Sequence, residues 1–302
     1  MRFKLDKILC AADFSAHFRQ VMHYGVGLAL QFEARLLILH SVCFPHNPLY
    51  GTAVYNRSDE HKKLGRKAGE TVEKLMKGYS ANWEPVITFG EPVEEIVRVA
   101  DEQDVDMVIA ASHGLSGLKR MLFGTVVERL VREMTRPVLV VRLPAHHEQS
   151  ASAENKLCFG KIVTGCDVSA KAIPMLGYAM EVAAEFGAEL HLLHAIERPV
   201  DKELMDSDQA PYGEVQQAMQ DRLRQKLLQL AAEASDAPCD LKAAVLQGVP
   251  GERLSSYAAE NASDLIIIGK HQHTAIEKLL VGSTAEAVLR SDPCPVMVLS
   301  EK

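Results

Sequence analysis

The 302-residue sequence contains no apolar run approaching the roughly 18 residues that a membrane-spanning helix requires. Its opening stretch, MRFKLDKILCAADFS, also lacks the continuous apolar segment of a secretory signal peptide. We therefore expect neither membrane insertion nor signal-directed export, and we expect a cytoplasmic protein.

Metal-ligand and redox spacings are missing as well. The six cysteines include no CxxC pair, which argues against a zinc knuckle or a thioredoxin-like motif. Most of them lie in or beside apolar runs, where a free cysteine packs as a small hydrophobic residue. Four histidines lack metal-ligand spacing, namely His46, His61, His146 and His147. The sequence predicts a reduced chain and no metal site.

An excess of basic residues is also absent. The net charge is -7 and the isoelectric point about 6.0, which disfavours nucleic acid or an acidic membrane surface as a partner. Hydrophobic residues make up 47% of the chain, an ordinary globular value. The length predicts about two domains, each large enough to bury its own core.

What the sequence does contain is an internal repeat. KILCAADFS at 7–15 resembles KIVTGCDVS at 161–169, an offset of 154 positions. DMVIAASH at 106–113 resembles DLIIIGKH at 264–271, an offset of 158 positions. Chance does not keep register over such spans, so the chain is predicted to be two tandem copies of one domain. The copies are expected at 1–143 and 157–302, joined by the polar linker PAHHEQSASAENK at 144–156.

Within each copy, short apolar runs alternate with segments of helical periodicity. In the first copy, strands are expected at KILCAA, RLLILHSV, EPVITF, DMVIAAS and PVLVVRL, and helices at 15–31, 59–80, 92 to about 102, and 125–135. Ser15 is the expected N-cap of the first helix. This order predicts an α/β fold with two doubly wound, mostly parallel five-stranded sheets flanked by helices. Such sheets bind ligands beyond the carboxyl ends of their strands, where the strand order reverses.

Two aspartates occupy this position after the first strand of each copy, Asp13 and Asp167. A carboxylate there accepts hydrogen bonds from a ribose or from a metal-bound water, or it caps the turn into the next helix. The sequence leaves both roles open. His40 and His194 end the second strand of each copy and are predicted to be hydrogen-bonded histidines beside the core.

A glycine followed by a hydroxyl residue precedes the last helix of each copy, as Gly124-Thr125 and Gly282-Ser283. The exposed N–H groups and the dipole at a helix N-terminus suit a phosphate. An ordinary helix cap is the alternative role for both pairs.

These residues belong to a longer pattern: glycine, two residues, glycine, nine residues, then glycine with serine or threonine. The first copy has Ala111, Gly114 and Gly124-Thr125 at these places, and the second has Gly269, Gln272 and Gly282-Ser283. Nearly the whole chain resembles the universal stress protein (UspA-like) family in its tandem two-domain form. The resemblance rests on this pattern, on the aspartate after the first strand and on the terminal strand of each copy.

The resemblance implies an adenine nucleotide alpha hydrolase-like fold that binds ATP, AMP or ADP, with an accompanying Mg²⁺ left open. Asp13 and Asp167 would face the adenosine side, and the glycine loop would surround the ribose and phosphates. The predicted binding residues are Ala12, Asp13, Ala111, His113, Gly114, Gly124, Thr125, Val126, Asp167, Gly269, His271, Gly282, Ser283 and Thr284. No catalytic residue is predicted.

The two copies depart from the family pattern differently. Ala111 is tolerated if its φ is negative, because it adds only a methyl group. Gln272 replaces the glycine expected nearest the phosphates, where a positive φ or a close backbone approach would impair binding. The first copy is therefore predicted to be the ATP site, and the second to be weakened or adapted to a smaller ligand such as AMP.

In single-domain relatives the last strand pairs across a dimer. The resemblance thus implies that PVLVVRL and PVMVLS form an internal pseudo-dimer, and a homodimer of whole chains is expected beyond it. The implied function is a stress-response sensor or regulator, not an efficient enzyme. A nucleotide-free interaction scaffold and a slow ATPase are the alternatives. An adenylating ATP-pyrophosphatase is disfavoured because AADFS and GCDVS lack the glycine pair of an SGGxDS-like loop.

Overall fold

The computed structural model describes residues 3–43, 57–112, 124–142, 157–197, 212–270, 282–291 and 293–300. The chain forms two compact units, a first unit of Lys4–Leu157 and a second unit of Met1–Phe3 with Cys158–Lys302. Phe3 belongs to the second unit, where its ring meets that of Tyr178 edge-on at 5.5 Å between centroids. The linker predicted at 144–156 lies outside the described residues.

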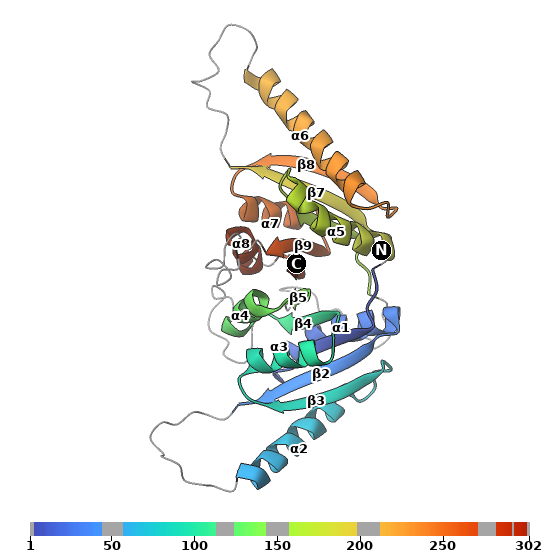
Figure 1. The fold of residues 1–302 in the computed structure, drawn as a ribbon, viewed down its shortest axis with the longest axis vertical. Helices are drawn as coiled ribbons and strands as arrows, with labels where there is room; N and C mark the ends of the chain where they lie inside the picture. Colours follow the sequence, from blue (N-terminus) through green and yellow to red (C-terminus); the bar gives the residue numbers. More distant parts are fainter. Residues whose placement is uncertain are drawn as a thin grey trace, which may run out of the picture. The chain divides into compact units, whose positions relative to one another are not determined.

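The first unit is a parallel sheet with helices on its faces (Figure 1). Its elements are β1 (Lys7–Ala11), α1 (Phe18–Phe32), β2 (Arg35–Val42), α2 (Arg57–Met76), β3 (Trp83–Phe89), α3 (Pro92–Glu102), β4 (Met107–Ala111), α4 (Thr125–Glu133) and β5 (Val138–Val141). The strand order is β3-β2-β1-β4-β5, and each neighbouring pair is parallel.

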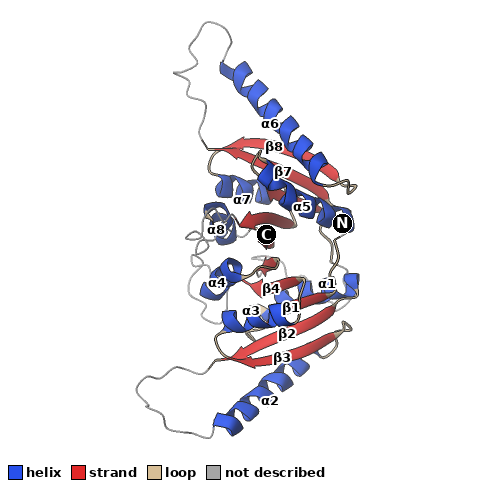
Figure 2. Cartoon of the chain, in the orientation of Figure 1, coloured by secondary structure: helices blue, strands red, loops and turns tan. Residues whose placement is uncertain are grey.

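The second unit repeats this arrangement (Figure 2). Its elements are β6 (Lys161–Gly165), the 3₁₀ helix η1 (Ala170–Ala172), α5 (Ile173–Phe186), β7 (Glu189–Ile196), α6 (Tyr212–Ala234), β8 (Asp240–Gln247), α7 (Pro250–Glu260), β9 (Leu265–Lys270), α8 (Ser283–Ser291) and β10 (Val296–Ser300). The strand order is β8-β7-β6-β9-β10, again parallel throughout. The predicted tandem α/β fold is confirmed.

The central strands are apolar on both sides because helices cover both faces of each sheet. Ile8, Leu9 and Cys10 of β1 are fully buried. Helix α1 packs on β1 and β4, α2 packs on β2 and β3, and α3 lies beside α4. In the described part of the chain, no helix is both long enough and apolar enough to cross a membrane.

An aspartate repeated in both copies anchors the amino ends of the first strands. Asp106 Oδ2 accepts hydrogen bonds from the backbone N–H groups of Asp6 and Lys7, at 2.7 and 2.8 Å. Asp264 Oδ2 does the same for Gly160 and Lys161, at 2.8 and 2.9 Å. These aspartates lie at the edge of the sheet opposite the predicted ligand edge, so their recurrence reflects the fold.

The first helix begins later than predicted. Ser15 is not its N-cap, because α1 starts at Phe18 with His17 in the capping position. The Ser15 hydroxyl instead accepts the His17 N–H at 3.2 Å, within a turn that precedes the helix. In the second unit, the corresponding Ser169 caps the short helix η1 by accepting from the N–H of Lys171.

Candidate functional site

The strand order of the first unit reverses between β1 and β4. β1 pairs with β2 on one side and with β4 on the other, with Cys10 opposite Ile109. The carboxyl ends of β1 and β4 therefore lie side by side, so Ala12 and Asp13 are close to Ala111. The structure thus brings the predicted residues after both strands to one edge of the sheet, the place where open α/β sheets bind ligands.

Asp13 uses one carboxylate oxygen to fix the turn after β1. Its Oδ1 accepts the Ser15 N–H at 2.9 Å. Asp167 likewise accepts from the N–H and hydroxyl of Ser169, at 3.2 and 2.8 Å. Within the described ranges, Oδ2 of each aspartate has no protein hydrogen-bond partner. Each aspartate therefore fixes a turn in its copy, and this turn uses only Oδ1.

A histidine supports the residue before each aspartate. His40 Nδ1 lies 2.7 Å from the carbonyl oxygen of Ala12, and His194 Nδ1 lies 3.1 Å from that of Cys166. With a carbonyl as partner, the Nδ1–H must donate. The prediction of hydrogen-bonded histidines beside the core is confirmed.

Phe14 is a feature of the first unit that the sequence did not predict. Its φ is +57°, a left-handed conformation that is unfavourable for a residue with a bulky side chain. Its ring stacks on that of His40, with centroids 4.1 Å apart and an interplanar angle of 23°. Val168 stands at this place in the second unit and does not have a positive φ. The turn after Asp13 therefore has a different backbone conformation from the corresponding turn after Asp167.

The N-terminus of α4 reaches the same edge through Gly124. Its N–H donates to the carbonyl of Ser112, the residue after β4, at 3.1 Å. The first intrahelical bond of α4 runs from Glu128 to the Gly124 carbonyl, so the N–H groups of the first helical residues, Thr125 to Val127, have no acceptor within the helix. Thr125 and Val126 are exposed. N–H groups without an intrahelical acceptor, a hydroxyl and the positive end of a helix dipole fit a phosphate.

The corresponding glycine of the second unit has a different backbone. Gly282 has a φ of +84°, whereas Gly124 has a φ of -62°. Ser283 is exposed and begins α8, with Thr284 behind it. Gly269 lies in β9, followed by Lys270, whose side chain is almost fully buried; this burial lowers the pKa of Lys270 to about 8.

The structure does not describe every predicted site residue. His113, Gly114 and His271 lie outside the described residues, and so does Gln272. Ala111 is described, and it is not among the residues of positive φ, which meets the condition set for replacing a glycine there. The described ranges contain no group of three or more His, Cys, Asp or Glu residues able to hold a metal ion.

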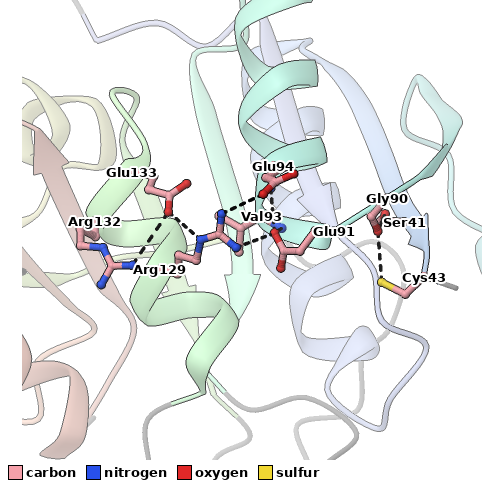
Figure 3. A network of polar contacts seen from close by, with 9 residues as sticks. All are labelled: Ser41, Cys43, Gly90, Glu91, Val93, Glu94, Arg129, Arg132 and Glu133. Carbon is pink, nitrogen blue, oxygen red and sulfur yellow. Dashed lines mark hydrogen bonds and ion pairs between the residues drawn. The ribbon is translucent and has the colours of Figure 1, made fainter. Parts of the chain in front are cut away.

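An ionic network that the sequence analysis did not predict lies beside α4 (Figure 3). We call it the Arg129 cluster; its members are Arg129, Glu91, Glu94 and Glu133. The Arg129 guanidinium meets Glu91 at 2.9 Å, Glu94 at 3.2 Å and Glu133 at 2.6 Å. Hydrogen bonds to Glu133 and then to Glu94 raise the pKa of Arg129. The available signal was the pair of substitutions at offset 158, Val249 for Glu91 and Ala287 for Arg129.

Comparisons with known proteins identify the family of the chain. The sequence model of the Universal stress protein family matches residues 4–142 and 159–300. Universal stress protein MJ0577 of Methanocaldococcus jannaschii is 35% identical over 158 residues, covering 47% of this chain and 98% of that protein. A universal stress protein of Mycolicibacterium smegmatis is 22% identical over 302 residues, covering 97% of this chain and 96% of that protein.

A solved structure shares the tandem fold. The crystal structure of a universal stress protein from Archaeoglobus fulgidus covers 99% of this chain and 98% of its own, with a TM-score of 0.67 and 20% identity. At this identity the similarity supports the fold alone.

Proposed function

Since the chain belongs to the universal stress protein family, we propose that it binds an adenine nucleotide at the carboxyl edge of the first unit's sheet. We further propose that it acts as a stress-response sensor or regulator and not as an efficient enzyme. The observation that carries this proposal is that one edge of the sheet holds both Asp13, whose turn uses only Oδ1, and the N-terminus of α4, whose first N–H groups have no intrahelical acceptor.

Each group has a chemical task in this proposal. Asp13 Oδ2 accepts hydrogen bonds from ribose hydroxyls, while Oδ1 keeps the turn fixed through Ser15. The N–H groups of Thr125 and Val126 and the Thr125 hydroxyl donate to phosphate oxygens. A Mg²⁺ ion, if it accompanies the nucleotide, would be held largely by phosphates and water.

We propose that the two copies differ in ligand. The first takes ATP through Gly114 and Gly124, and the second, with Gln272 in the loop, takes a smaller nucleotide such as AMP or binds weakly. Regulation would follow from occupancy, because a bound nucleotide changes which surfaces and loop conformations are favoured. A homodimer of the whole chain remains a prediction.

Titration calorimetry on the full-length protein tests the proposal. Asp13→Asn and its matched control Asp167→Asn are each titrated with ATP, AMP and GTP. We expect Asp13→Asn to weaken ATP binding by about tenfold, the loss of one charge-assisted hydrogen bond, and Asp167→Asn to leave it nearly unchanged. Gly114→Val should abolish ATP binding, and Gly282→Val should not. The opposite pattern would reverse the ranking of the copies, and absence of binding to the wild type would favour the scaffold.

A further inference from the structure

The Arg129 cluster joins the helix that carries the candidate phosphate site to a neighbouring helix. Arg129 lies four residues after Thr125, on the same face of α4. Its Nε pairs with Glu133, one turn further along α4. The two terminal nitrogens of its guanidinium meet Glu91 and Glu94 at the start of α3 (Figure 3).

Glu91 is itself fixed in place. It is the N-cap of α3 and accepts hydrogen bonds from the N–H groups of Val93 and Glu94, at 3.1 and 3.2 Å. The same carboxylate oxygen, Oε2, pairs with Arg129. The ion pair therefore ends on a carboxylate that two backbone N–H groups hold in place.

The residue before Glu91 is bonded to the end of β2. The carbonyl of Gly90 accepts the hydroxyl of Ser41 at 2.8 Å and the thiol of Cys43 at 3.1 Å, and the Gly90 N–H donates to Val42 at 3.2 Å. β2 also carries His40, which contacts Ala12 beside Asp13. These polar contacts, linked through the backbone at His40-Ser41 and at Gly90-Glu91, connect the Asp13 side of the site to the α4 side.

The second unit lacks several of these side chains but keeps others, since Glu252 stands at the place of Glu94 and His194 at that of His40. Ala195, Glu197, Val249 and Ala287 occupy the places of Ser41, Cys43, Glu91 and Arg129. Helices α7 and α8 instead pack through small residues, since a Cβ added to Gly251 would lie 2.5 Å from that of Ala287. The fold therefore keeps this helix pair together without an ionic cluster, so the cluster in the first unit needs another explanation.

We propose that Arg129 is a positioning residue for nucleotide binding in the first unit. Its ion pairs with Glu91 and Glu94 set the distance and direction of the α4 N-terminus relative to Asp13, which fixes where a phosphate binds. This inference rests on the proposed function. The Arg129 and Glu91 side chains are 33% and 40% exposed, so their effect on overall stability is small and their effect on geometry is the measurable one.

The test compares Arg129→Ala, the residue of the second unit, with Arg129→Lys and with Arg98→Ala in the full-length protein. Arg98 is the matched control because it pairs with Glu95 and Glu102 of its own helix α3. Calorimetry with ATP should show an affinity about 3- to 30-fold weaker for Arg129→Ala, an intermediate value for Arg129→Lys, and no change for Arg98→Ala. Lysine keeps the charge but not the planar fork that reaches several carboxylates.

Hydrogen exchange separates this inference from the proposed function. Amides of 125–130 should exchange faster in Arg129→Ala than in the wild type or Arg98→Ala, with or without nucleotide. If the wild type binds no nucleotide, the proposed function fails and the positioning role fails with it, whatever the exchange shows. If the wild type binds ATP and Arg129→Ala binds it equally well, or if Arg98→Ala weakens binding as much, the positioning role alone is overturned.

Discussion

Helix α1 approaches β1 closely only because residue 25 is glycine, and this contact gives a prediction of defined size. A Cβ added at Gly25 would lie 2.4 Å from the Cys10 sulfur and 3.3 Å from Leu36 Cδ1. Cys10 is fully buried, so its sulfur has little room to move. Overpacking a core lowers the free energy of unfolding by up to about 3 kcal/mol. Replacing a glycine within a helix by alanine raises it by about 1 kcal/mol, because alanine has the higher helix propensity. Gly25→Ala should therefore lower the free energy of unfolding by about 2 kcal/mol.

Urea unfolding monitored by circular dichroism measures this change. Gly69→Ala is the matched control, because Gly69 lies in α2 and its added Cβ meets nothing within 4 Å. That variant should be more stable than the wild type by about 1 kcal/mol. Adding Cys10→Ala to Gly25→Ala should recover part of the loss, since the sulfur is the nearest obstacle. If Gly25→Ala proved as stable as Gly69→Ala, the reasoning about close packing at β1 would be refuted.

Two further predictions concern the second unit. Gly282→Ala should destabilise the protein by about 1 kcal/mol because Gly282 has a φ of +84°. Gly124→Ala should be nearly neutral, because Gly124 has a φ of -62°. Thermal unfolding of both variants measures the difference, and equal losses of stability would contradict the different backbone conformations of the two glycines. Glu189 accepts from Lys242 and His191, which lowers its pKa to about 2 from 4.5. Its stabilising effect is thus present above pH 4.5 and lost as the pH falls toward 2. The stability difference between wild type and Glu189→Gln should shrink over that range in acid titrations, and a constant difference would argue against the ion pair.

The sequence predicted regular elements best where apolar periodicity was long. RLLILHSV coincides with β2 (Arg35–Val42), and the helix expected from Pro92 to about Glu102 coincides with α3. The helix ends were less accurate because local polar bonds decide them. Residues 13–17 form a turn through Asp13 and Ser15, which delays the start of α1. The helix expected to reach Ser80 stops at Met76, before Gly78, which has a φ of +102°.

The candidate site was predictable in place but not in detail. The strand order brings Asp13, Ala111 and the α4 N-terminus to one edge, as expected for a doubly wound sheet. The left-handed Phe14 and its stack on His40 depend on tertiary packing that no local pattern records. The repeat identifies the residues that both copies share, such as Asp13 and Asp167. The differences, such as Arg129 against Ala287, carry more information about which copy is specialised.

The most direct test of the central claim is mass spectrometry of small molecules released when the purified full-length protein is denatured. The account predicts an adenine nucleotide at about one molecule per chain, in a reduced amount in Asp13→Asn and in an unchanged amount in Asp167→Asn. Release of no nucleotide, together with no binding of added ATP or AMP, would contradict it.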